Sequence, residues 1–271
     1  MRLVSILFFI LLSLNAIAQT STNTKTEKRA IICLTYDDAL PSQLAVAIPQ
    51  LDSMGFKATF FMNSIKGSTE LMGVGEAAIL GWKQAAQQGH ELANHTLFHP
   101  CPEHIGWQKE LAIESYTLSK LFTEIKVANL FLSTLDENRK VRSFAFPCNN
   151  FMVEGADYAE KLRATKLVTY ARAGGDKTSI VREFKTLNTM KVPSWLVGEG
   201  TTLAELVAFA KDVKANGKMG VYQFHGIGSP LFKISPAVHR QFLKYLKDNQ
   251  ADYWVTTFSD AMDFVTSTEK N

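Results

Sequence analysis

The alternation of strand and helix patterns constrains this chain more than any other feature of its sequence. Residues 30–36 form a continuous apolar run, as expected for a strand that is buried on both faces. Pro41 opens a helical pattern that Gly55 ends. Further predicted segments are 57–62 (strand), 76–88 (helix), the strand leading to His95, 103–132 (helix), 141–146 (strand), 162–170 (helix end, then strand), 202–215 (helix), 219–225 (strand), 235–247 (helix) and 253–257 (strand). We therefore predict one parallel α/β domain over residues 30–271, barrel-like rather than split.

The first residues follow a different pattern from this domain. An apolar run over 3–14, followed by Ala16-Ile17-Ala18, predicts a signal peptide at residues 1–18. Residues 19–29 are polar without apolar periodicity and predict a flexible leader. Because the apolar run is too short to span a bilayer and no later segment is long enough, we expect an exported protein, periplasmic or secreted, with no transmembrane segment in its mature chain.

The charge balance restricts the classes of partner. The chain has 29 Lys and Arg against 26 Asp and Glu, and it contains no basic tract. Nucleic acid is therefore not the expected partner, whereas a neutral ligand is compatible with this balance.

Three cysteines in an exported chain leave at least one of them unpaired. Cys33 lies in the apolar run 30–36 and is expected to be a small core residue. Cys101 and Cys148 each follow a motif assigned below to one site. A disulfide between them is one arrangement that the sequence leaves open, because spacing along the chain does not give the distance between them.

His95 and His99 form the first candidate metal pair. Helical or turn geometry brings imidazoles at this spacing to one side, where they can hold a metal such as zinc. Pro100 disfavours helix at His99, so the pair is expected where a strand ends and a loop begins. His90-Glu91 looks like the start of a zinc-protease helix, but the next histidine comes one residue too late for that motif.

Other polar residues also follow predicted strands, and the carboxyl ends of such strands form the active site in barrel-like α/β folds. Asp37-Asp38 ends the first strand, and His225 ends a late one. Taken alone, the acidic pair is better explained as the cap of the helix that Pro41 opens, and a single strand-end histidine is more often structural. Together, one Asp and two His can hold a metal with a position open for water, while a spare Asp and a spare His remain. Metal-assisted hydrolysis suits this set, with Asp37 taking a proton and His225 giving one to the leaving group.

Asp37-Asp38, the pattern His95-Thr96-Leu97-Phe98-His99 and the late His225 resemble, in this order and spacing, the polysaccharide deacetylases of the NodB type, carbohydrate esterase family 4. The segment Ala58-Thr59-Phe60-Phe61 is also similar to that family's second strand. The resemblance extends from about Ile31 to the last strand.

The resemblance implies a distorted (β/α) barrel and a divalent metal, usually Zn²⁺, held by Asp38, His95 and His99. It implies Asp37 as the general base and His225 as the general acid. The backbone N–H of Cys148, directly after Pro147, would stabilise the oxyanion. The expected substrate is an acetylated oligo- or polysaccharide, which would lose an N- or O-linked acetyl group.

Two departures from the family pattern concern the partners of these residues. Ala145 stands where the family often has an arginine that pairs with the base, and Ser194-Trp195 stands where it often has Asp-Trp. Arg142 or Arg172 is a candidate for the missing arginine, and Asp176 for the missing aspartate. Losing such a partner changes a pKa by roughly 1–3 units.

Among the four tryptophans, Trp195 is the preferred candidate for stacking on a sugar ring because it follows a strand-end proline, although core packing is the alternative for all four.

Two other functions remain open. One is a carbohydrate-binding protein on a catalytically impaired barrel, which Ala145 and Ser194 favour. The other is a metal phosphohydrolase with Asp37 as nucleophile, which would need a lysine that these motifs lack.

Overall fold

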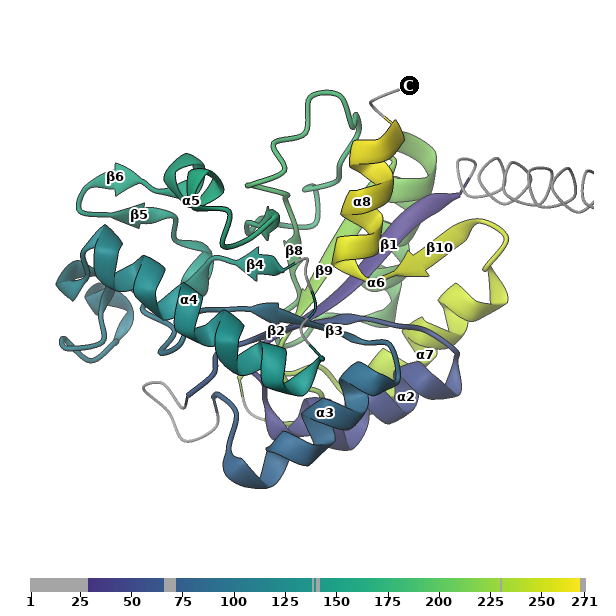
Figure 1. The fold of residues 1–271 in the computed structure, drawn as a ribbon. Helices are drawn as coiled ribbons and strands as arrows, with labels where there is room; N and C mark the ends of the chain where they lie inside the picture. Colours follow the sequence, from purple (N-terminus) through teal and green to yellow (C-terminus); the bar gives the residue numbers. More distant parts are fainter. Residues whose placement is uncertain (1–28, 66–71, 138, 140–141, 230, 269–271) are drawn as a thin grey trace, which may run out of the picture.

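The computed structural model describes residues 29–65, 72–137, 139, 142–229 and 231–268 (Figure 1). Its strands are β1 (Ala30–Asp37), β2 (Thr59–Met62), β3 (Glu91–Asn94), β4 (Ser143–Ala145), β5 (Met152–Val153), β6 (Ala156–Asp157), β7 (Tyr170–Arg172), β8 (Trp195–Leu196), β9 (Met219–Phe224) and β10 (Tyr253–Thr256). Its α-helices are α2 (Ile48–Ser53), α3 (Ile79–Gln87), α4 (Leu118–Leu135), α5 (Ala159–Thr165), α6 (Leu203–Asn216), α7 (Pro236–Asp248) and α8 (Phe258–Thr268).

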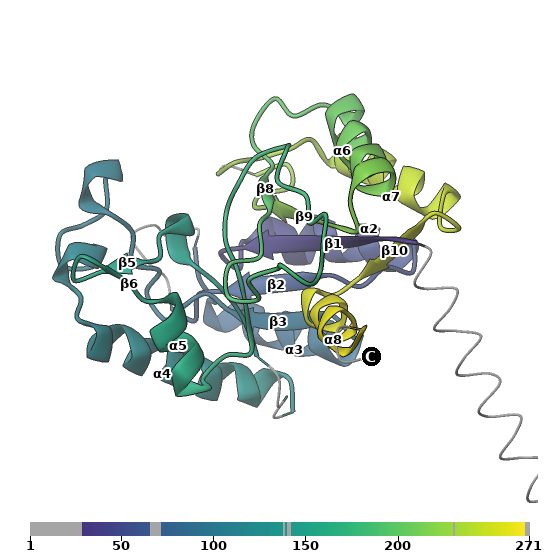
Figure 2. The ribbon, with the colours of Figure 1, turned by 90° about the horizontal axis from the view of Figure 1, so that it is seen from above.

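Eight of the strands form one parallel sheet in the order β7-β4-β3-β2-β1-β9-β8, with β10 also paired to β1. β1 carries three neighbours because its two halves use different ones. Its first half, Ala30–Cys33, pairs with β10, and its second half, Thr35–Asp37, pairs with β2. The sheet divides along β1 and curls into a half-barrel, which confirms the predicted distorted (β/α) barrel. Only β5 and β6 form a separate antiparallel hairpin, which lies beside α5 (Figures 1 and 2).

The apolar run of β1 separates two cores, because successive side chains of a strand point to opposite faces. Ile32, Leu34 and Tyr36 pack on the side of the sheet covered by α2, α3, α6 and α7. Ile31 and Cys33 belong to the second core, inside the curl, which α8 closes. Burial on both faces explains why this strand is apolar throughout instead of alternating.

Several predicted helix boundaries are confirmed. The Thr202 side chain accepts from the backbone N–H of Glu205, whose side chain accepts from the N–H of Thr202, so the capping box of α6 is present. Ser235 caps α7 in a similar way, directly before Pro236.

The predicted helix over 103–132 is only partly correct. α4 begins at Leu118, after Thr117, whose side chain accepts from the N–H of Lys120. The preceding stretch contains two short 3₁₀ turns, Glu103–Ile105 and Ile113–Ser115, instead of a helix. Gly106 has φ 91°, a left-handed conformation that ends the first turn. The last helix, α8, was not predicted.

The predicted signal peptide at residues 1–18 lies outside the described residues, as does all of the predicted leader except Arg29. Within the described ranges, no helix has both the length and the apolar character needed to cross a membrane.

Candidate active site

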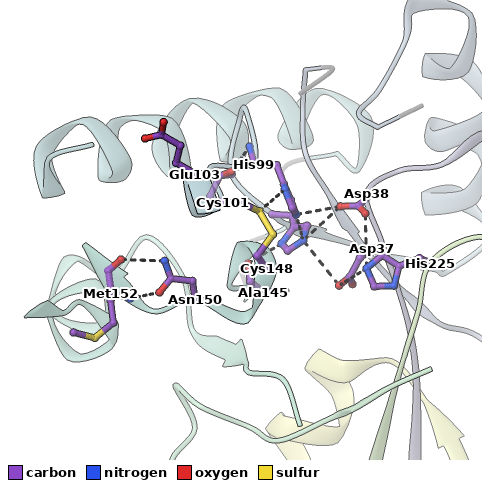
Figure 3. Close-up of a disulfide and its surroundings, with 12 residues drawn as sticks. Asp37, Asp38, His99, Cys101, Glu103, Ala145, Cys148, Asn150, Met152 and His225 are labelled. Carbon is purple, nitrogen blue, oxygen red and sulfur yellow. Dashed lines mark hydrogen bonds and ion pairs between the residues drawn. A yellow bond between two sulfur atoms is a disulfide. The ribbon is translucent and has the colours of Figure 1, made fainter. Parts of the chain in front are cut away.

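Three strands of the parallel sheet deliver the candidate polar residues to one pocket. Asp37 is the last residue of β1 and Asp38 follows it, His95 and His99 follow β3, and His225 follows β9. All five side chains are buried and line the same pocket. In Figure 3 the two carboxylates lie between His99 on one side and His225 on the other. The candidate residues therefore lie together at the carboxyl ends of three parallel strands.

Asp38, His95 and His99 bring three potential metal-ligand atoms together. The Asp38 Oδ1 atom lies 3.2 Å from His99 Nε2 and 3.7 Å from His95 Nε2. The potential ligand atoms of the three residues all lie within 4.8 Å of one another. The Oδ1 atom is buried and accepts no hydrogen bond from any described residue.

The tautomers of the two histidines also fit a cation. His95 Nδ1 lies 2.8 Å from the Ala145 carbonyl oxygen, to which it donates, and His99 Nδ1 lies 3.3 Å from the Cys101 sulfur. The two Nε2 atoms lie 3.0 Å apart, and they present two lone pairs to each other when both rings carry their proton on Nδ1. Two lone pairs in contact repel unless a positive charge lies between them, so this donor set suits a divalent metal such as zinc.

The pKa shifts of Asp38, His95 and His99 also suit a bound cation. Burial, and next the neighbouring Asp37 carboxylate, raise the pKa of Asp38 well above its usual range. Burial lowers the pKa values of His95 and His99, which keeps both rings neutral. Neutral imidazoles are the form that binds metal, and a cation would offset the cost of the buried Asp38 charge.

Asp37 is held by an arginine from another strand. Its Oδ2 atom accepts from Arg172 Nη2 at 2.6 Å and from Gln223 Nε2 at 3.0 Å. Burial raises the pKa of Asp37. Arg172, and after it His95 and His225, lower this pKa by a larger amount together, so the net shift is downward. Asp37 is therefore ionised near neutral pH, as a general base must be.

Of the two arginine candidates, Arg172 occupies the position next to the base. Arg142 instead pairs with Asp136, with Nη1 2.6 Å from Oδ2, and donates to the Leu92 carbonyl oxygen. Asp176 is exposed, and its carboxylate accepts from Thr178. It therefore does not replace the missing aspartate.

His225 faces both carboxylates. Its Nε2 atom lies 3.9 Å from Asp37 Oδ2 and 3.8 Å from Asp38 Oδ2. Its Nδ1 atom has no hydrogen-bond partner among the residues that the structure describes. Burial lowers the pKa of His225 to about 4, against the opposing effect of Asp37, so the ring is neutral at neutral pH.

The two residues predicted to form the oxyanion side of the site, Pro147 and Cys148, lie in the turn after β4. Pro147 is buried in the turn that follows β4, and Cys148 lines the pocket with φ 52°. Cys148 forms a disulfide with Cys101, the pairing that the sequence left open, while Cys33 is free and buried.

The prediction for Trp195 is wrong. Its ring is 7% exposed and packs against Phe209 and Tyr222, so neither face is open to a sugar. Trp195 begins the short strand β8 instead of following it, and its side chain points into the core under α6. Trp107 lines the pocket instead, with its ring centre 5.3 Å from that of His99.

Several pocket residues were not predicted from the sequence. Gln223 was detectable, because it lies in β9 two residues before His225, which directly follows that strand, and alternation along a strand puts residues at this spacing on one face. The apolar residues that line the pocket had no comparable signal in the sequence, because most of them lie in loops. These residues are Met72, Ile105, Trp107, Leu196, Leu231 and Phe232.

Comparison with known proteins agrees with this fold. The family description "Polysaccharide deacetylase" matches residues 24–166, a little more than half of the 271 residues. The chain therefore belongs to the polysaccharide deacetylase family, the NodB-type hydrolases of carbohydrate esterase family 4, which act on amide or ester bonds. A search of curated proteins found no match.

Several solved structures share the fold at low identity. A carbohydrate esterase family 4 domain of a multidomain xylanase, from the hindgut metagenome of Trinervitermes trinervoides, is 15% identical, with TM-score 0.53 over 87% of this chain and 90% of that one. A peptidoglycan deacetylase from Bacillus subtilis is 14% identical, with TM-score 0.55 over 89% and 94%. A mutant of a family pseudoenzyme with restored enzymatic activity is 15% identical, with TM-score 0.53 over 86% and 68%.

Proposed function

We propose that this protein is an exported, metal-dependent hydrolase that removes acetyl groups from a carbohydrate. Asp38, His95 and His99 hold a divalent metal, most suitably Zn²⁺. Asp37 is the general base and His225 the general acid. The observation that carries the proposal is the convergence of His95 Nε2, His99 Nε2 and the buried Asp38 Oδ1 atom, with the two nitrogens 3.0 Å apart and Oδ1 accepting no hydrogen bond from any described residue.

A bound zinc ion would polarise the acetyl carbonyl and acidify water. The chain's own residues then handle the protons. Asp37 Oδ2, ionised and held by Arg172, takes the proton of the attacking water. Because His225 starts neutral, the proton delivered to the leaving nitrogen or oxygen is the one taken from water. Asp37 Oδ2 and His225 Nε2 lie 3.9 Å apart, so one intervening water molecule relays this proton from the carboxyl group to the imidazole. The N–H of Cys148 donates to the developing oxyanion.

The substrate proposal rests on the family and on the pocket. Members of this fold include a peptidoglycan deacetylase and a domain of a xylanase, both directed at saccharides. Apart from Asp37, Asp38 and the histidines, the described lining residues are uncharged, which suits a neutral acetylated sugar. We further propose that residues 1–18 direct export and that residues 30–271 form the catalytic domain.

Acetate release from N-acetylated and O-acetylated oligosaccharides, measured with added zinc, tests the function. We expect turnover by the wild type and a loss of about a hundredfold or more in Asp37→Asn. The matched control is Asp248→Asn, which removes a surface carboxylate paired with Lys244. His95→Ala should lose both bound zinc and activity.

A carbohydrate-binding protein without turnover is the second candidate. The unpartnered Nδ1 of His225 favours it, because no described carboxylate orients that ring. Stoichiometric zinc together with saccharide binding, but no acetate release from any acetylated sugar and no effect of Asp37→Asn, would establish this second function and exclude the first.

A further inference from the structure

The disulfide joins two segments that both contribute residues to the proposed reaction centre. Cys101 lies two residues after His99, in the segment that leaves β3. Cys148 lies in the turn after β4, directly after Pro147. Figure 3 shows the bridge on the His99 side of the site, away from His225.

The Cys101 end of the bridge contacts a proposed metal ligand. Its sulfur lies 3.3 Å from His99 Nδ1, so it accepts the proton of that nitrogen. This contact directs the opposite nitrogen, Nε2, towards Asp38 Oδ1 at 3.2 Å. Fixing one ring nitrogen of a ligating histidine in this way sets both its tautomer and its orientation.

The Cys148 end of the bridge holds an unusual turn. Cys148 and Asn149 have φ 52° and 54°, two successive non-glycine residues in the left-handed region. Such a conformation is costly and persists only where surrounding contacts impose it. Cys148 lines the pocket, and the direction of its backbone N–H depends on this turn.

The strands themselves connect these segments only weakly. β3 and β4 pair in register only at Asn94 and Phe144. Past the strand ends, His95 Nδ1 donates to the Ala145 carbonyl oxygen, which anchors the first histidine of the pair to the β4 segment. The disulfide performs the same task for the second histidine, His99.

We propose that the Cys101–Cys148 disulfide is a positioning element of the catalytic centre. It fixes the position of the His99 imidazole relative to the Cys148 N–H. Reduction of the disulfide therefore weakens metal binding and slows turnover. The metal part of this inference stands on the contacts of His99 alone, whereas the turnover part rests on the proposed deacetylase function.

Reduction of the folded wild type with a water-soluble phosphine is the direct test. The phosphine attacks one sulfur and breaks the S–S bond. Water then supplies the oxygen of the phosphine oxide and the protons of the two thiols. Alkylation under denaturing conditions should count one thiol before treatment, Cys33, and three after it. Three thiols before treatment would overturn the proposal.

The readouts are zinc affinity by competition with a chromophoric chelator, the visible spectrum of the Co²⁺ form, and kcat and KM for acetate release. We expect zinc affinity to fall by about tenfold, a typical effect of losing a partner that orients a ligand. The Co²⁺ spectrum should change, and kcat should fall by about tenfold or more with KM little changed. The variant Cys101→Ala/Cys148→Ala should show the same values and should not respond to phosphine.

Other results would overturn the inference. Unchanged zinc affinity, Co²⁺ spectrum and kcat in reduced, folded protein would reduce the bridge to a structural crosslink, even if the melting temperature falls. If the double variant does not fold, the phosphine titration of the wild type, followed by circular dichroism, still decides. If the oxidised protein releases no acetate, the proposed function fails, while the zinc and Co²⁺ readouts still test the bridge.

Discussion

Arg172 shows how one side chain can supply a missing charge from a neighbouring strand. The family resemblance led us to expect an arginine near Ala145 on β4, but the guanidinium reaches Asp37 from the end of β7. β4 and β7 are paired, with Ala145 in register with Arg172, so the two positions lie side by side at the same edge. The Arg172 side chain is fully buried and also lies over the Phe61 ring.

We predict that Arg172→Ala lowers kcat by about a hundredfold, because the buried Asp37 carboxylate loses its strongest partner. Added guanidinium ion should restore part of the activity, since it can occupy the vacated space. The control is Arg163→Ala, which removes an exposed arginine paired with Glu160. Wild-type kcat in Arg172→Ala would contradict this role.

Glu124 supports the loop between the two histidines. Its carboxylate accepts from the backbone N–H groups of Phe98 and Leu97, and from the Tyr116 hydroxyl. We predict that Glu124→Gln weakens zinc binding by about tenfold, because the amide replaces a charged acceptor with a weaker one. Chelator competition measures this. Glu160→Gln, at an exposed position, should leave zinc affinity unchanged.

At the scale of elements, the contact between β9 and α6 determines how closely a helix approaches the sheet that carries His225. A Cβ atom at Gly220 would lie 2.5 Å from Val213 Cγ2 and 2.8 Å from Phe209 Cε1, both on α6. Glycine is needed here for close packing and not for a left-handed backbone.

We therefore predict that Gly220→Ala destabilises the protein by about 1–3 kcal/mol, because α6 must move away from the sheet. Chemical unfolding of the variant measures the loss. Gly198→Ala is the matched control, since a Cβ there meets no atom within 4 Å, and it should change the free energy of unfolding by less than about 0.5 kcal/mol. Equal stabilities of the two variants would refute the packing argument.

At the scale of the whole molecule, buried neutral histidines tie stability to pH. His239 Nε2 lies 2.6 Å from the Tyr36 hydroxyl and Nδ1 lies 2.7 Å from Gln50 Oε1, so a neutral ring satisfies both contacts. Burial lowers the pKa of His239 to about 3. His90, beside Asp52, has its pKa lowered to about 4, again mainly by burial.

In the unfolded chain these histidines bind a proton below pH ~6.5, whereas in the folded protein His239 stays neutral down to about pH 3. The stabilising contribution is therefore complete above pH ~6.5 and decreases as the pH falls. We predict a loss of about 3 kcal/mol from His239 between pH 7 and pH 4. Denaturant unfolding at both pH values measures it, and His239→Gln should flatten the profile. An equally steep profile in that variant would assign the effect to other groups.

Local sequence patterns predicted most of the strands and helices in their order, the parallel α/β class, and the position of Asp37, Asp38, His95, His99 and His225 at strand ends. These features depend on local periodicity, on caps such as Thr202, and on the rule that parallel strands end at one edge. Each can be recognised within a few residues of the chain.

The packing of segments distant in the chain, by contrast, determined which side chains meet. It put Arg172, and not Arg142, next to Asp37, and it put Trp107, and not Trp195, in the wall of the pocket. It also brought Cys101 and Cys148 together as a disulfide. It further divided the pairing of β1 between β2 and β10, which curls the sheet. Such choices depend on strand neighbours and side-chain directions set by packing between segments distant in the chain, and no local pattern encodes those distances.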